Sequence, residues 1–120
     1  MKSSLPLSRQ VVVVHRDAAI RQGTAEQLLH QGYLPTLGTS AEDAYVLCGR
    51  LQPSMLLLET DLVGESGFLV CAKVKLQHPH CKVVLIDSAH GAGYLPYARF
   101  VGADAVVEAH APVASLVTRI

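Results

Sequence analysis

The sequence predicts an α/β domain in which five parallel strands form one doubly wound sheet. Short apolar runs alternate five times with segments of helical periodicity, and capping or turn residues separate the two kinds of segment. One run, at residues 55–58, is apolar without interruption, which is typical of a strand that helices cover on both faces. The crossovers of such a sheet are right-handed.

The first half of the chain supplies three strands, which we expect at residues 11–14, 34–37 and 55–58. Asp17 can cap a helix over Ala18–His30, which Gly32 closes. Pro35 cannot donate to a central ladder, so its strand belongs at the sheet edge. Ser40, with Asp43 three positions on, can cap a second helix that reaches Leu51.

The second half supplies two more strands, at residues 83–86 and 105–107. We expect a helix over Gly67–Gln77 that ends before Pro79. Its core face is assigned to four apolar residues, Phe68, Leu69, Ala72 and Leu76. A short helix follows around residues 94–100, with Pro96 in its first turn, and the edge position of Pro35 favours the flavodoxin-like strand order 2-1-3-4-5.

Length and composition indicate one domain and exclude several classes of protein. The chain has 120 residues, of which 50% are hydrophobic and 17% charged, so a buried core is expected and disorder is not. No apolar run could span a bilayer, and no signal peptide precedes the domain, so we expect a cytoplasmic protein without membrane contact. Ten basic and ten acidic side chains cancel, and no basic face indicates nucleic-acid binding by this domain.

The remaining compositional features concern the cysteines and the two ends of the chain. Three cysteines, Cys48, Cys71 and Cys81, lack a metal-type spacing and suit a reducing cytosol as ordinary core or surface residues. Residues 1–9 resemble a leader. A last helix beginning at Pro112 would be short, which suggests that the single domain of residues 1–120 comes from a longer protein with a downstream output domain.

The stretch at residues 53–67, PSMLLLETDLVGESG, contains the first candidate for function. Its apolar run ends in a carboxylate, Glu59, and a polar loop follows. Functional groups of open parallel sheets lie just beyond the carboxyl ends of the strands. We therefore expect the functional site around Glu59.

Five segments together resemble the receiver domain of bacterial two-component response regulators over nearly the whole chain. They are VVVVHRDAAIR, QGYLPTLGTSAEDA, PSMLLLETDLVGESG, KVVLIDSAHG and GADAVVEAHAP, in the order and spacing of that family. The resemblance implies an acidic pair that binds magnesium after the first strand and a phosphate-accepting aspartate at the end of the third. It also implies a hydroxyl after the fourth strand and a lysine after the fifth, both of which respond to the phosphoryl group.

Most of these positions are changed in this chain. The hydroxyl position is kept as Ser88. His15 and Arg16, which Asp17 follows, occupy the positions of the acidic pair, and Glu59 occupies the position of the phosphoacceptor. After the fifth strand, Ala109 occupies the position of the lysine and His110 that of the proline after it. Within the fifth strand, Val106 occupies a position that is often aromatic in the family. The resemblance therefore implies a degenerate receiver, a pseudo-receiver.

The substitutions remove what phosphoryl transfer to a carboxylate needs, which is positioning and charge neutralisation. Arg16 would repel magnesium and could instead pair with Glu59. Glu59 also reaches one methylene further than aspartate. We therefore expect no conventional magnesium site, no cofactor and no enzymatic activity, but a signalling module that works through protein contacts.

Several alternatives remain open at this stage. Glu59 either imitates a phosphorylated aspartate together with Ser88, or pairs with Arg16 and simply fills the disused pocket. Asp61 is a conceivable substitute acceptor, which would make the chain a phosphorylatable receiver with unusual residues. A third alternative is a small-molecule or metal sensor that uses the altered pocket around His15, Arg16, Glu59, Asp87 and Ser88, with Asp17, Asp61 and His110 as further possible pocket residues. Its metal ligands would come from His15, Glu59, Asp87, His90 and His110.

The last third of the chain is unusually poor in charge. Residues 94–101 and 105–117 contain many apolar side chains, some of which must belong to the core. If the others form one exposed patch, it is a candidate surface for a protein partner or a homodimer. Nucleic acid would then be bound only by a separate output domain.

Overall fold

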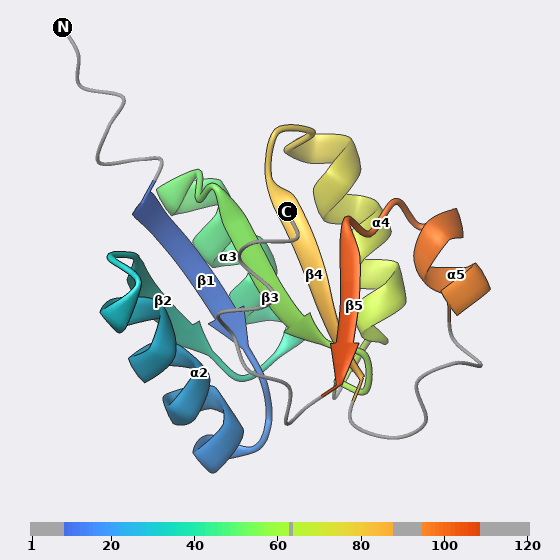
Figure 1. Cartoon of the computed structure of the whole chain (residues 1–120). Coiled ribbons are helices and arrows are strands. Elements are labelled where there is room, and N and C mark those ends of the chain that lie inside the picture. Colours follow the sequence, from blue (N-terminus) through green and yellow to red (C-terminus); the bar gives the residue numbers. More distant parts are fainter. Residues whose placement is uncertain (1–8, 63, 88–94, 109–120) are drawn as a thin grey trace, which may run out of the picture.

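The computed structural model describes residues 9–62, 64–87 and 95–108. In these ranges five parallel strands form one sheet in the order β2-β1-β3-β4-β5, which confirms the predicted fold class and order (Figure 1). The strands are β1 (Gln10–Val14), β2 (Leu34–Gly38), β3 (Met55–Glu59), β4 (Lys82–Asp87) and β5 (Ala105–Glu108). Pro35 lies in β2 at the sheet edge, as its missing N–H predicts.

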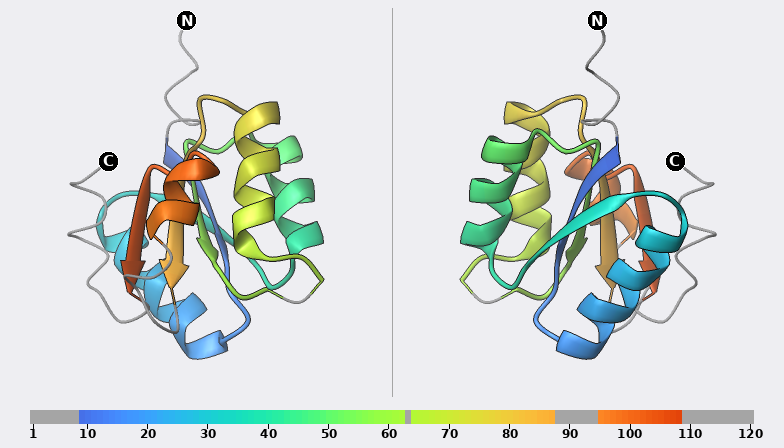
Figure 2. Two further views of the ribbon diagram at one scale, coloured as in Figure 1. Left: turned by 90° about the vertical axis from the view of Figure 1, so that its right-hand side faces the viewer. Right: turned by 90° about the vertical axis from the view of Figure 1, so that its left-hand side faces the viewer.

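Helices cover both faces of the sheet. They are α2 (Ala18–His30), α3 (Ala41–Leu51), α4 (Gly67–Gln77) and α5 (Leu95–Phe100). Figure 2 shows α3 and α4 on one side of the sheet and α2 on the other. The predicted bounds of α2, α3 and α4 are confirmed, and Pro96 lies in the first turn of α5. The helix predicted to begin at Pro112 lies outside the described residues.

The helix caps follow the chemistry of the capping residues. Asp17 Oδ1 accepts hydrogen bonds from the N–H groups of Ala19 (2.9 Å) and Ile20 (3.1 Å) at the start of α2. Ser40 Oγ accepts from the Asp43 N–H at the start of α3. Gly32 has a φ of +91° after α2, a conformation that favours glycine.

The core has two parts, one on each face of the sheet. Alternate residues of the central strands point to opposite faces. Leu56 and Leu58 therefore belong to the cluster beneath α3 and α4, whereas Met55 and Leu57 belong to the cluster beneath α2. Every residue of β3 is buried, so Glu59 ends the most enclosed strand of the described sheet.

The predicted core face of α4 is wrong at Leu69 and Leu76, whereas Phe68 does pack, partly buried, against the core cluster beneath α3 and α4. The residues that α4 buries are Gly67, Val70, Cys71 and Val74. By contrast, Leu69 is 45% exposed and Leu76 is 84% exposed. The helix is apolar on nearly all sides, so hydrophobic periodicity alone could not select the buried face.

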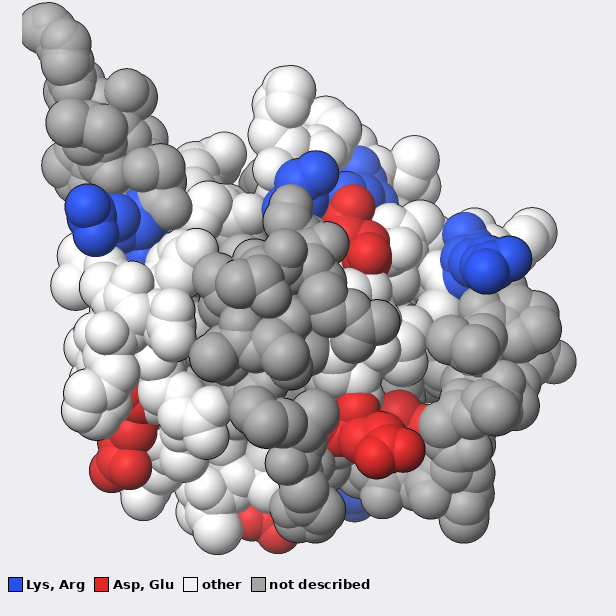
Figure 3. Space-filling view, in the orientation of Figure 1, with Lys and Arg blue, Asp and Glu red and all other residues white. Residues whose placement is uncertain are grey.

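On the face in Figure 3, basic and acidic side chains lie scattered over several elements. None of the helices in the described ranges combines the length and the apolar character needed to cross a membrane.

Candidate functional site

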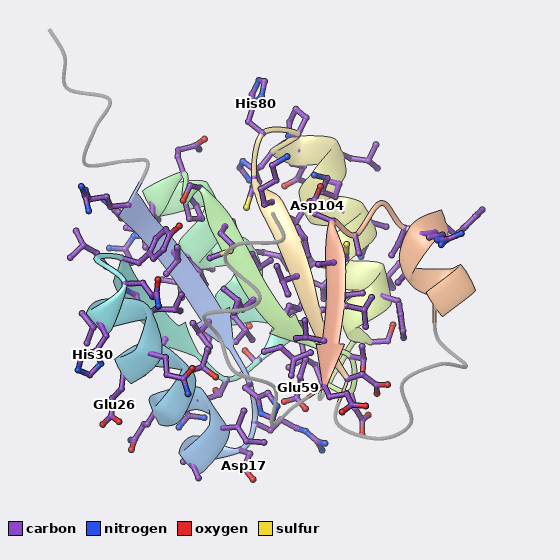
Figure 4. All side chains as sticks on the ribbon, viewed as in Figure 1. Asp17, Glu26, His30, Glu59, His80 and Asp104 are labelled. Carbon is purple, nitrogen blue, oxygen red and sulfur yellow. The ribbon has the colours of Figure 1, made fainter. Side chains whose placement is uncertain are left out.

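The carboxyl ends of β1, β3 and β4 bring several polar residues to one edge of the sheet. In the strand register Val14 lies beside Leu58, and Glu59 beside Ile86, so the residues after Val14 face the end of β3. Figure 4 shows Glu59 and Asp17 at this same end. Glu59 is fully buried, with a relative exposure of 0%.

Arg16 binds both oxygens of the Glu59 carboxylate. Its backbone N–H donates to Oε2, and its Nε lies 3.3 Å from Oε1. Its Nη2 also lies 3.2 Å from Oδ2 of Asp61, whose side chain is 74% exposed. The predicted Arg16–Glu59 pair is therefore confirmed, and Arg16 links the buried carboxylate to an exposed one.

His15 lies next to Glu59 and is buried, with 2% exposure. The Asp17 N–H donates to Nδ1 of His15 at 3.0 Å, so the neutral ring carries its proton on Nε2. Burial lowers the pKa of His15, although the Glu59 carboxylate, 3.5 Å from Nδ1, opposes that shift. The Nε2 atom is buried and has no hydrogen-bond partner among the described residues.

Arg21 supports this arrangement, and sequence reasoning missed it. Its Nη1 donates to the carbonyl oxygen of His15 at 2.7 Å and approaches that of Arg16 at 3.4 Å. A cation in the first turn of a helix is unfavourable against the helix dipole unless it finds acceptors nearby. Its position in the first turn of α2, four residues after the Asp17 cap, was the available signal.

Gly67 is a second residue whose role was missed. A Cβ on Gly67 would lie 2.0 Å from the carbonyl oxygen of Glu59 and 2.8 Å from Cα of Thr60. Both are backbone atoms, which cannot move aside as a flexible side chain can. The Gly67 N–H donates to the Thr60 carbonyl at 2.9 Å, so α4 begins directly against the strand end that carries Glu59.

Three of the other predicted site residues lie in the described part of the chain. Asp87 ends β4 and is buried, with 4% exposure. Asp17 caps α2, and the N–H groups of Ile20 and Ala19 lower its pKa. Val106 is partly buried against the cluster beneath α3 and α4. Four predicted residues lie outside the described part of the chain, Ser88, His90, Ala109 and His110.

The metal-sensor alternative gains no ligand set from the described residues. Within them, no three His, Cys, Asp or Glu side chains come together in a way that could hold a metal ion. Two of the histidines on which that alternative depends, His90 and His110, lie in ranges without a description.

Comparisons with known sequences give one match. No protein-family model matches the chain. It is 28% identical over 87 residues to the adventurous-gliding motility protein Z of Myxococcus xanthus, a match that covers 71% of this chain but only 6% of that protein. Thus the chain spans a small fraction of the length of this relative.

Solved structures show the likeness more fully. A CheY-like receiver domain protein from Methanospirillum hungatei superposes with a TM-score of 0.85 at 18% identity, covering 93% of this chain and 90% of that one. A Burkholderia pseudomallei response regulator, solved with a phosphorylated aspartic acid, gives 0.86 at 18% identity over 93% of this chain and 66% of that one. The receiver domain of Klebsiella pneumoniae RstA gives 0.83 at 22% identity over 92% and 93%. The chain therefore has the fold of response regulator receiver domains.

Proposed function

We propose that this chain is a receiver-like signalling module that acts through protein contacts without conventional aspartyl phosphorylation. The observation that supports it best is the contact between Arg16 and Glu59. Both oxygens of the carboxylate at the phosphoacceptor position are bound by one residue, and Glu59 is 0% exposed. A phosphoacceptor needs an oxygen that the donor can approach in line, with cations around the transferred group.

Magnesium does not fit the residues at this edge of the sheet. The ion takes an octahedron of oxygens and usually one or two carboxylates. Here the guanidinium of Arg16 lies 3.3 Å from the carboxylate that would be the ligand, and its charge opposes a dication. We therefore include no magnesium, other cofactor or catalytic turnover in the proposed function.

Of the two interpretations of Glu59, we favour the one in which it fills the pocket as the partner of Arg16. A mimic of phosphoaspartate would have to present its charge to the switch hydroxyl. The charge of Glu59 is already matched by Arg16, which follows β1, and it lies next to the buried ring of His15. Signals would then come from a partner rather than from the state of Glu59.

Protein contacts are the proposed output, in a bacterial cytoplasmic protein that also carries other domains. Phe100, at the end of α5, is 89% exposed and lies within the predicted partner surface of residues 94–101 and 105–117. Large exposed aromatic side chains are enriched in protein interfaces. The relative from Myxococcus xanthus is far longer than this chain, which agrees with a module inside a larger protein.

Beryllofluoride with magnesium tests the proposal, because this complex imitates a phosphoryl group on a receiver carboxylate. A ligand that binds only the folded state raises the melting temperature. We expect an unchanged melting temperature for this chain and a rise for a conventional receiver measured beside it. A rise for this chain that needs both components would overturn the proposal.

The exposed carboxylate of Asp61 favours a second candidate function, a phosphorylatable receiver with an unusual acceptor. The Asp61 side chain is 74% exposed, so a donor can reach it, and Arg16 would neutralise part of the phosphoryl charge. Asp61→Asn distinguishes this candidate, since a beryllofluoride response that vanishes in the variant assigns the binding to Asp61.

A further inference from the structure

The outward side of α3 carries two charges and one apolar side chain in a regular row. Glu42, Val46 and Arg50 are exposed and follow one another at intervals of four residues, so they lie along one side of the helix. The residues that α3 buries, Ala41, Ala44 and Cys48, lie on the side that faces the sheet. We call Glu42, Val46 and Arg50 the α3 stripe, and nothing in the proposed signalling function uses it.

The two charges of the α3 stripe have no counter-charge in the described part of the chain. No ion pair joins the Glu42 carboxylate or the Arg50 guanidinium to another described residue. By contrast, both lysines of α4 are paired, Lys73 with Glu65 at 2.6 Å and Lys75 with Asp104 at 3.0 Å. The two charges of the stripe lie about 12 Å apart along the helix axis, which is too far for them to pair with each other.

The neighbouring helix α4 adds apolar surface beside the stripe. Figure 2 shows α3 and α4 side by side on the same face of the sheet. The Tyr45 hydroxyl donates to Glu65 at 2.6 Å, and the ammonium group of Lys73 lies 5.7 Å from the centre of the Tyr45 ring, so these contacts join the two helices. On α4, Leu69 is 45% exposed and Leu76 is 84% exposed. An exposed apolar area with charges at its rim is typical of a surface that binds another protein.

The α3 stripe is complementary to itself. Val46 is the middle residue of α3, and Glu42 and Arg50 lie four residues before and after it. If two copies of α3 pack antiparallel about a two-fold axis at Val46, each Glu42 lies opposite the Arg50 of the other copy, and the two valines meet at the axis. Antiparallel packing also brings opposite ends of the two helix dipoles together. A parallel pair would instead place like charges side by side.

The backbone of α3 can be approached closely beside the stripe. Gly49 is exposed, and no atom lies within 4 Å of a Cβ added to it. Glycine destabilises the interior of a helix relative to alanine, and no contact of the added Cβ accounts for its presence here. A second helix that crosses near Val46 can occupy the space that a larger side chain would fill.

We propose that two copies of this chain associate through α3, in an antiparallel two-fold contact centred on Val46. Two Glu42–Arg50 pairs join the copies at either side of the axis, and Leu69 and Leu76 of α4 enlarge the apolar part of the surface. A helix of 11 residues is about 16 Å long, so the contact is small and the dimer is weak. This surface is distinct from the predicted partner surface at residues 94–101 and 105–117, and the contact does not depend on the state of Glu59.

Sedimentation equilibrium of the full chain, at concentrations up to the millimolar range, tests this contact. We expect the average mass to rise from that of a monomer toward that of a dimer, and to rise less at high salt, because salt screens exposed charge pairs. Glu42→Arg and Arg50→Glu each convert both pairs into like-charge contacts. Each variant should therefore dimerise at least about tenfold more weakly than the unchanged chain.

A mixture of the two charge-reversal variants tests the antiparallel register. When Glu42→Arg meets Arg50→Glu, the new arginine of one copy faces the new glutamate of the other, and the second pair keeps its original residues. An equal mixture should therefore dimerise about as well as the unchanged chain, although neither variant does so alone.

Two further variants locate the contact. Val46→Asp places two carboxylates at the axis and should abolish the dimer. Glu26→Arg is the matched control, because it makes the same change of charge as Glu42→Arg at an exposed position of α2, on the other face of the sheet (Figure 2). It should leave dimerisation unchanged.

Three results would overturn the α3 contact. One is a chain that stays monomeric at every concentration. Another is a dimer that Val46→Asp and both charge reversals leave unchanged, which would assign the contact to a different surface. The third is a mixture of the two charge-reversal variants that dimerises no better than either variant alone. Circular dichroism establishes that each variant is folded before its mass is measured.

Discussion

Arg16 binds Oε2 of Glu59 through its backbone N–H and Oε1 through its guanidinium Nε at 3.3 Å. The carboxylate is buried, whereas the Arg16 side chain is 47% exposed. A substitution at position 16 therefore removes the guanidinium contact but keeps the backbone donor, while a substitution at position 59 weakens both contacts.

Glu59→Gln should cost more stability than Arg16→Ala. Hydrogen bonds to a buried charged group contribute about 1.5–3 kcal/mol, so we expect a loss of about 2 kcal/mol for Glu59→Gln. Because solvent screens the half-exposed guanidinium, Arg16→Ala should cost about 1 kcal/mol or less. Urea unfolding of both variants measures the difference, and an equal or larger loss for Arg16→Ala contradicts the assigned geometry.

Gly67→Ala should destabilise the chain severely. The added Cβ would meet the Glu59 carbonyl oxygen at 2.0 Å, and α4 would have to move away from the end of β3. We expect a loss of about 3 kcal/mol, in the range found for overpacked sites. Gly49→Ala in α3 is the matched control, since nothing lies within 4 Å of its added Cβ. Alanine in an open helical position should raise stability by about 0.5–1 kcal/mol in chemical unfolding.

Gln52→Gly should stabilise the chain. Gln52 ends α3 in the left-handed region with a φ of +49°, which costs a residue with a Cβ about 1 kcal/mol relative to glycine. We expect a gain of several tenths of a kcal/mol, measured as a higher urea midpoint at unchanged slope. Gln31→Gly is the control. Gln31 ends α2 with a φ of −88°, so glycine there should give no gain.

Stability should fall on mild acidification because of His15. The folded-state pKa of His15 lies below its unfolded value, near 6.5, so between these two values the unfolded chain binds more protons. Its contribution is therefore complete above pH 6.5 and declines as the pH falls toward the folded-state pKa. Charged groups around the ring are Glu59, Asp17, Arg16 and Arg21.

His15→Asn isolates this effect, because its side-chain oxygen can still accept from the Asp17 N–H. The variant should lose less stability than the parent between pH 7 and pH 5. Identical pH profiles, measured by urea unfolding, would mean that His15 titrates alike in the folded and unfolded chain.

The fold could be predicted because local signals and long-range packing agree in most elements. The β-branched run of β1, the caps Asp17 and Ser40 and the edge proline Pro35 each indicate the same topology that the structure has. Strand ends extend one residue beyond several predictions, as at Glu59, because backbone pairing continues past the apolar run.

The buried face of α4 could not be predicted from the hydrophobicity of its residues alone. The buried residues of α4 recur at helical spacing, and the first of them is Gly67, the residue that packs against the backbone of Glu59 and Thr60. The others are Val70, Cys71 and Val74. The glycine therefore determines which apolar side faces the sheet, and Leu69 and Leu76 remain outside. A search for small residues at helix starts would have found this face.

The Arg16–Glu59 pair was predictable because both residues follow strands that end at one edge of the sheet. The role of Arg21 was not, since it depends on a side chain that meets the carbonyl oxygen of His15 only in the folded chain.

Intact mass after incubation with acetyl phosphate and magnesium tests the central claim most directly. We predict that the chain gains no phosphoryl mass under conditions in which a conventional receiver is labelled, because Arg16 binds both oxygens of a fully buried Glu59. One added phosphoryl group that is lost in Glu59→Gln or in Asp61→Asn would contradict phosphorylation-independent function and identify the carboxylate that accepts it.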